Sequence, residues 1–215
     1  DARTASEILD NWHRTTLVGD DHLIAEWNMD RLYTGTGNGL NGAQMVLDGS
    51  GTNHNLILNS TIADAVGNHG LVMGTGAGIS GAPIDGRYGM MVGSQGLVAA
   101  NAATLANGTG AFTIGGWVRT SGLAAQTLMA LGDPGTQLGS AVFGLDSGGH
   151  LTFDGNNLQG KVSSAAIPND GQWHYVAVTY GNTAVGGYGQ VSFSVDGSAF
   201  ETQDVLNSAT APVNL

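Results

Sequence analysis

The chain has 215 residues, of which 41% are hydrophobic and 11% are charged, so it can bury a full core and we expect one folded domain. It carries 6 Lys and Arg residues against 17 Asp and Glu residues, a formal net charge of −11, and no basic cluster, which excludes nucleic acid and anionic lipid as partners. The lack of cysteine excludes disulfides and thiolate metal sites. No apolar run approaches the length of a membrane span, so we expect no membrane insertion.

The first predicted element is a short helix near the start of the chain. Thr4 and Glu7 have the spacing of a capping box, in which each residue bonds to the backbone of the other. Ile8, Leu9 and Trp12 then follow at roughly helical intervals. We expect this helix to last about three turns at most.

After the helix, the sequence consists of short apolar runs separated by Gly, Asn, Asp or Pro. Such runs are typical of β-strands joined by tight turns, and many of them together indicate a sandwich or a barrel. The predicted strands are 23–29, 55–59, 70–73, 88–92, 112–119, 127–131, 141–146, 150–154, 173–180 and 190–196.

The alternation of side chains is clearest in the second half of the chain. The strand 173–180 is apolar on both faces, which predicts a central strand of a covered sheet. Turn residues at 146–149 and at 196–197 predict two hairpins. All four tryptophans lie in patterned segments, so we expect them in the core: Trp12, Trp27, Trp117 and Trp173.

Several segments together resemble the laminin-G-like, concanavalin A-like jelly-roll family. They are FTIGGWVRTS (112–121), LMALGD (128–133), FGLDSGGHLTFD (143–154), DGQWHYVAVTY (170–180) and VSFSVDG (191–197), with IAEWNMD (24–30) and LDGSGTNHNL (47–56) before them. The most specific of these is DGQWH leading into VAVTY. The resemblance implies an all-β fold, an antiparallel two-sheet jelly-roll sandwich, here with a short N-terminal helix.

The two ends of the chain depart from the family pattern. Residues 2–8, ARTASEI, are similar to the helix that ends a family module, and the chain stops before a last strand of the family type. We therefore interpret residues 1–18 as the tail of a preceding module and 19–215 as a sandwich lacking its last strand. The missing strand is then expected from a neighbouring copy or from a longer parent chain.

Catalytic motifs are missing from the sequence. Glycosidases on this fold carry closely spaced Glu and Asp residues on one strand, and the nearest approach here, Glu201 and Asp204, has the wrong spacing. Neither a G-x-S-x-G elbow nor an H-E-x-x-H zinc motif is present. We predict that the chain is not an enzyme. The six histidines are expected at the surface or in turns.

Candidate binding residues lie in the loops. Calcium prefers oxygen ligands, and Asp30, Asp48 and Asn53 are the first candidates, although Asp and Asn beside Gly are also ordinary turn formers. Tyrosines close to glycine-rich loops could form a platform for a sugar ring. These are Tyr33, Tyr88, Tyr180 and Tyr188.

The resemblance implies a non-catalytic module at the cell surface or outside the cell. Its partner is then a glycan or the extracellular matrix, with Ca²⁺ as the candidate cofactor and no cofactor as the alternative. The alternative is a structural repeat or filament subunit, which assembles with neighbouring copies of the same protein by strand completion between subunits.

The calcium hypothesis predicts a lower thermal midpoint when a chelator is added. An ion that binds only the folded state adds about 2.7 kcal/mol at a free concentration of roughly 100 times its Kd. The check is differential scanning calorimetry with calcium and with chelator, on the wild type and on a Asp48→Asn, Asn53→Ala variant. The variant should have the same thermal midpoint with calcium and with chelator. An unchanged midpoint of the wild type would contradict the hypothesis.

Overall fold

The computed structural model contains one short helix and fifteen strands in the part of the chain that it describes. It describes residues 3–11, 23–27, 33–34, 44–46, 49–50, 56–58, 71–73, 79–80, 89–91, 97–99, 111–120, 124–132, 140–154, 160–181 and 189–205. The elements are α1 (Ala5–Asn11), β1 (Tyr33–Thr34), β2 (Gln44–Val46), β3 (Leu56–Leu58), β4 (Leu71–Met73), β5 (Ile79–Ser80), β6 (Gly89–Met91), β7 (Leu97–Ala99), β8 (Phe112–Thr120), β9 (Gln126–Gly132), β10 (Ser140–Leu145), β11 (His150–Asp154), β12 (Lys161–Ala166), β13 (His174–Gly181), β14 (Gly189–Val195) and β15 (Glu201–Val205).

The larger sheet of the sandwich has the strand order β15-β14-β13-β8-β4-β6-β5. The strands β8, β13, β14 and β15 pair antiparallel, with Val178 opposite both Ile114 and Phe193. The prediction of a central strand at 173–180 is confirmed, because β13 lies between β8 and β14 and is buried on both faces. The strand β4 differs from the rest, since it pairs parallel with β8 and with β6.

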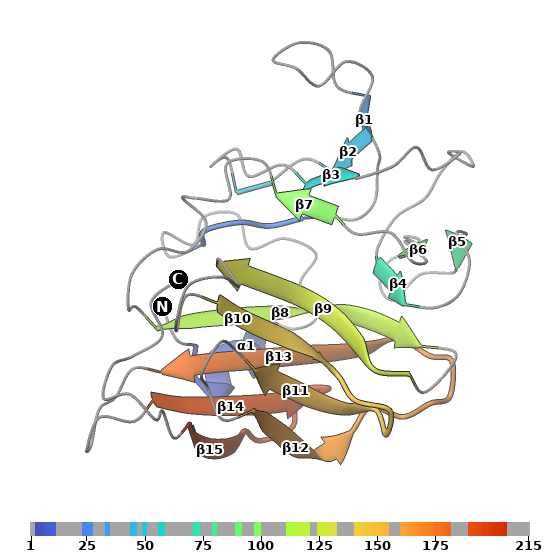
Figure 1. The fold of residues 1–215 in the computed structure, drawn as a ribbon. Helices are drawn as coiled ribbons and strands as arrows, with labels where there is room; N and C mark the ends of the chain where they lie inside the picture. Colours follow the sequence, from blue (N-terminus) through green and yellow to red (C-terminus); the bar gives the residue numbers. More distant parts are fainter. Residues whose placement is uncertain are drawn as a thin grey trace.

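The second sheet has the order β12-β11-β10-β9 and is antiparallel throughout (Figure 1). Together with the strands β8 and β13–β15, it confirms the predicted sandwich. The two sheets enclose one hydrophobic core, as expected when alternate side chains of each strand turn inward. The buried core residues are Phe112, Val118, Ala141, Phe143, Leu145, Leu151, Phe153, Ile167, Val176, Val178, Tyr180, Val191 and Phe193.

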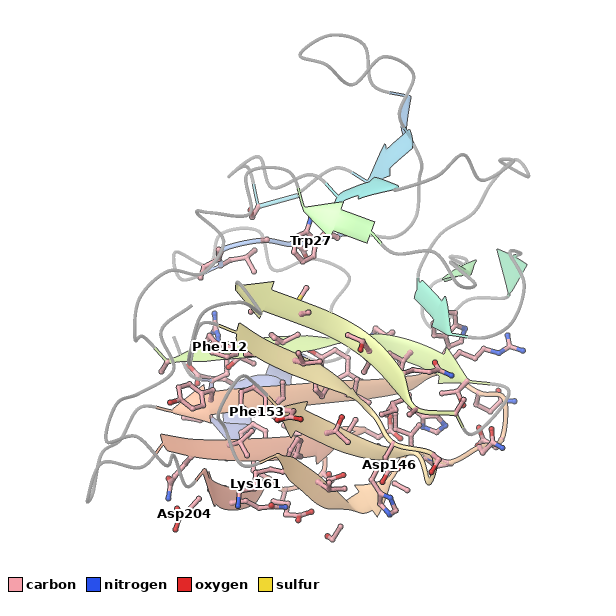
Figure 2. All side chains as sticks on the ribbon, in the orientation of Figure 1. Trp27, Phe112, Asp146, Phe153, Lys161 and Asp204 are labelled. Carbon is pink, nitrogen blue, oxygen red and sulfur yellow. The ribbon has the colours of Figure 1, made fainter. Side chains whose placement is uncertain are left out.

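Three stacked aromatic rings join the two sheets in the core. The ring of Tyr180 lies 5.4 Å from that of Phe112 and 5.9 Å from that of Phe153, measured between centroids. Phe112 and Phe153, both labelled in Figure 2, come from facing sheets. The exposed fraction of Tyr180 is 1%, so the expectation that it belongs to a sugar platform is wrong.

The described tryptophans are not core residues. Trp27, Trp117 and Trp173 are each half buried and lie outside the core cluster, while Trp12 lies outside the described residues. Because side chains alternate along β8, Trp117 lies on the face opposite Val118, where its ring meets Tyr175 edge-on at 5.7 Å. The core is therefore built from Phe, Tyr, Leu and Val instead.

The helix α1 packs on the outer face of the larger sheet (Figure 1). Thr4 and Glu7 form the predicted capping box: the Glu7 N–H donates to Thr4 Oγ1 (3.2 Å), and the Thr4 N–H donates to Glu7 Oε2 (2.7 Å). The Arg3 N–H donates to Thr113 Oγ1 on β8 (2.8 Å), and Ile8 is buried. The helix thus covers part of a sheet face that would otherwise be exposed.

The first half of the chain agrees less well with the predicted strands. In the segment predicted as a strand at 23–29, residues 23–26 are not in a strand, and Trp27 forms only an isolated bridge. The short strands β1, β2, β3 and β7 form a separate antiparallel sheet. Five of the described strands were not predicted. The strands β1, β2, β5 and β7 are only two or three residues long, and β12 lacks apolar alternation.

Both predicted hairpins are confirmed. The turn 146–149 joins β10 to β11, and the turn at Asp196 and Gly197 joins β14 to β15. Asp196 has a φ of 51° and Gly197 a φ of 69°, which is the pattern of a two-residue turn that matches strand twist. The Ser198 N–H closes this turn by donating to the Val195 carbonyl (2.9 Å).

Removing the Phe153 ring should destabilise the sandwich strongly. Phe153→Ala leaves a cavity between Phe112 and Tyr180, and such substitutions cost about 3–5 kcal/mol of unfolding free energy. Urea denaturation followed by fluorescence measures this loss. Leu9→Ala is the control, because Leu9 is exposed on α1 and its variant should change the unfolding free energy by less than about 0.5 kcal/mol. Equal losses in the two variants would contradict this description of the core.

Candidate functional site

The predicted ligand residues lie mostly outside the described part of the chain. Asp30, Asp48, Asn53, Tyr88 and Tyr188 are not among the described residues. Their proposed roles therefore stay predictions. Tyr33 opens β1, and the structure describes its backbone but not its side chain.

Three described turns gather at one end of the sandwich, which we call the loop end. It consists of the β10–β11 turn (146–150), the β12–β13 connection (167–173) and the β14–β15 turn (195–198) (Figure 1). Backbone hydrogen bonds join these segments: the Ile167 N–H donates to the Gly149 carbonyl (2.9 Å), and the Asp196 N–H donates to the Tyr175 carbonyl (2.8 Å). The loop end is thus held rigidly on the sandwich.

Asp146 organises the first of these turns. Its Oδ1 accepts hydrogen bonds from the Gly148 N–H (2.7 Å) and the His150 N–H (2.9 Å), and its Oδ2 lies 3.1 Å from His150 Nδ1. The backbone hydrogen bond from His150 lowers the pKa of Asp146 most, and that from Gly148 adds to it. Asp146, labelled at the end of the β10–β11 hairpin in Figure 2, therefore stays ionised.

A histidine between two aspartates connects the other two turns. His174 Nδ1 lies 2.8 Å from Asp196 Oδ2, and His174 Nε2 lies 3.1 Å from Asp170 Oδ1. Since ionised carboxylates only accept hydrogen bonds, both ring nitrogens can donate only when the imidazole is protonated. The exposed fraction of His174 is 7%, so the expectation that all histidines lie at the surface or in turns is wrong for this residue.

The protonation of His174 follows from its neighbours. Burial alone lowers the pKa of His174, but hydrogen bonds and charges from Asp196 and Asp170 outweigh burial and raise it above the ordinary value of 6.5. The Gln172 N–H and the His174 ring in turn lower the pKa of Asp170. The two carboxylates thus favour the protonated form of the His174 ring.

These carboxylates also anchor the backbone of the loop end. Asp170 Oδ1 accepts from the Gln172 N–H (2.8 Å), and Asp196 Oδ1 accepts from the Tyr175 N–H (2.9 Å). Oxygens engaged in this way are poorly placed to collect around a cation. Within the described ranges, no group of three or more His, Cys, Asp or Glu residues could hold a metal ion.

The outward face of the second sheet is the other described surface that a ligand could reach. Gly144 lies in it, and a Cβ there would come 2.5 Å from the backbone oxygen of Gln126, so a side chain has no room. The outward positions follow from the pairing of β9 to β12 and from the inward burial of Phe143, Leu151 and Phe153. They are Thr127, Ala130, Val142, Gly144, His150, Thr152, Asp154, Val162, Ser164 and Ala166, and this described face carries no Phe, Tyr or Trp side chain.

The cluster around His174 was missed by sequence reasoning. Its aspartates belong to Asp-Gly pairs, which were interpreted as turn residues only. The partnership depends on β13 pairing with β14, because that pairing brings residues 174 and 196 together. One signal was available: His174 occupies an inward position of an otherwise apolar strand, where a polar group needs partners.

A laminin-G family model, described as the concanavalin A-like lectin/glucanases superfamily, matches residues 92–214, which is more than half of the chain. The matched range contains β7 and all the strands from β8 to β15. No curated protein and no solved structure matches the chain. The resemblance predicted for 24–30 and 47–56 lies before the matched range and stays a prediction. No helix in the described ranges is long and apolar enough to cross a membrane.

His174 should make the stability of the protein depend on pH. Its pKa is raised in the folded state, so its contribution is complete below the ordinary value of 6.5 and is lost as the pH rises through the folded-state pKa. The unfolding free energy of the wild type should therefore fall, relative to His174→Gln, as the pH rises above 6.5. Urea titrations at a series of pH values measure it. His150→Gln, which leaves the cluster intact, should keep the decrease, and parallel curves for wild type and His174→Gln would refute this role.

Proposed function

Because the chain belongs to the concanavalin A-like lectin/glucanase superfamily, we propose that it is a non-catalytic binding module of an extracellular or cell-surface protein. Laminin-G-like domains of this kind are generally binding modules. The observation that carries the proposal is the match of the family to the β8–β15 sandwich. Its ligand is proposed to be a glycan or a component of the extracellular matrix.

The described carboxylates support a non-catalytic role. A glycosidase needs one carboxyl group with a raised pKa, which donates a proton to the leaving oxygen. Here the pKa values of Asp146, Asp170 and Glu201 are all lowered, mainly by hydrogen bonds from backbone N–H groups and from Ser164. Each of these groups is therefore a permanent acceptor at neutral pH.

We assign ligand recognition to the loops that carry the tyrosine candidates. The outer face of β8, β13 and β14 is partly covered by α1, and the described outward face of β9–β12 carries no Phe, Tyr or Trp side chain. Aromatic side chains give large and rigid contact areas at low entropic cost. Tyr33, Tyr88 and Tyr188 remain the proposed platform, and Asp30, Asp48 and Asn53 the proposed cation ligands.

A glycan array probed with the fluorescently labelled chain, with calcium and with chelator, tests this proposal. We expect binding to a restricted set of glycans. For the strongest ligand, a Tyr33→Ala, Tyr88→Ala, Tyr188→Ala variant should bind at least about tenfold more weakly by calorimetry, because ring contacts are lost. The matched control replaces the same three tyrosines with Phe, which keeps the rings.

Three outcomes separate the parts of the proposal. No binding to glycans or to matrix proteins would contradict a recognition module altogether. Binding that the Ala variant retains would move the platform to other residues. Binding of equal strength with calcium and with chelator would contradict the proposed cation site, but it would not affect the proposed tyrosine platform.

A further inference from the structure

One edge of the second sheet faces an edge of the larger sheet. Among the described strands, β12 ends the sheet β12-β11-β10-β9, and β15 ends the larger sheet on the same side. Figure 2 shows Lys161 of β12 and Asp204 of β15 along this side. The two strands belong to different sheets, so no backbone ladder joins them.

Two side chains of β15 bond to the outward backbone groups of β12. Gln203 Nε2 donates to the Val162 carbonyl (2.7 Å), and Glu201 Oε2 accepts from the Ser164 N–H (2.7 Å). Residues two apart on a strand point their backbone groups in the same direction, so both bonds lie on the side of β12 away from β11. The Val162 carbonyl and the Ser164 N–H on this side of β12 are thus already hydrogen-bonded.

The two side chains offer β12 the same hydrogen-bonding groups that a neighbouring strand would offer. A residue of an added strand would offer one N–H donor and one carbonyl acceptor to β12. Gln203 supplies the donor and Glu201 the acceptor. The Ser164 hydroxyl donates to the same Glu201 Oε2 (2.7 Å), and Gln203 Nε2 also donates to Glu201 Oε1 (2.8 Å), which ties the pair together.

The other described side chains of β15 serve a different purpose. Thr202 Oγ1 lies 2.8 Å from Ser192 Oγ, and Asp204 Oδ1 accepts from Gln190 Nε2 (3.0 Å). Both contacts join β15 to β14 within its own sheet. Alternate residues of β15 therefore have different partners. Thr202 and Asp204 bond to β14, whereas Glu201 and Gln203 bond to β12.

The edge strand β12 needs such protection. An edge strand exposes backbone groups that can pair with another chain, and natural proteins cover such edges or place charges on them. The strand is six residues long, KVSSAA, with Lys161 as its one charge, and the side chain of Val162 is 47% exposed. Its sequence gives little protection of its own.

We propose that Glu201 and Gln203 form a clasp that occupies the outer edge of β12 and prevents a strand of a second copy of this chain from pairing there. This device is separate from the proposed ligand recognition. It also bears on assembly by strand completion, because β12 cannot accept a strand while the clasp is closed. Any such completion must then use another edge.

The test compares two double variants of the full chain. Glu201→Ala, Gln203→Ala removes the clasp, and Thr202→Ala, Asp204→Ala removes an equal number of side chains from the same strand without touching β12. Hydrogen exchange followed by NMR reports on the Ser164 amide, and sedimentation velocity over a range of concentrations reports on association. Near-UV circular dichroism shows whether each variant keeps its packing.

In the clasp variant, the Ser164 amide should exchange about tenfold faster, as expected for the loss of one charge-assisted hydrogen bond. Its average mass should also rise with concentration, while the control variant should behave as the wild type does. The proposal is overturned if the clasp variant keeps the wild-type mass at every concentration, or if Ser164 exchanges at the wild-type rate. If the clasp variant does not fold, the single variant Glu201→Ala decides, since it removes the acceptor of the Ser164 N–H and should show the same two changes.

Discussion

The structure depends on the burial of β13 between two other strands and beneath a second sheet. Val176, Val178 and Tyr180 point into the core, and Ala177 is buried on the opposite face. A strand buried on both faces can hold its place only if its neighbours on either side are in register, because a slip by one residue would exchange its faces. The register with β8 and β14 in turn places the residues of the loop end.

Polar side chains of this sandwich form hydrogen bonds with backbone groups at the turns and at the sheet edge, where the pairing between strands ends. At the loop end, Asp146, Asp170 and Asp196 accept from backbone N–H groups that no strand would satisfy. At the sheet edge, Glu201 accepts from the Ser164 N–H of β12, and Gln203 donates to the Val162 carbonyl. Asp146, Asp170, Asp196 and Glu201 of this acidic chain thus each accept from backbone donors.

This use of carboxylates connects the fold to the proposed function. Hydrogen bonds from backbone N–H groups keep Asp146 and Asp170 ionised, which suits a fixed surface of acceptors and does not suit proton transfer. His174 differs, since hydrogen bonds to two carboxylates outweigh its burial and raise its pKa. A binding module needs such rigidity, because a preorganised surface loses little entropy when a ligand binds.

The sequence by itself determined the capping box at Thr4, the hairpin turn at Asp196 and most of the strands from 112 onward, because each depends on neighbours within a few residues or on alternation along one strand. It did not reveal β12, whose residues lack apolar alternation, or the half-buried positions of Trp27, Trp117 and Trp173. Only the tertiary structure decided that Asp196 meets His174 and that Glu201 meets Ser164. These contacts join residues 22 and 37 positions apart, and they exist only once strand register and sheet packing are set.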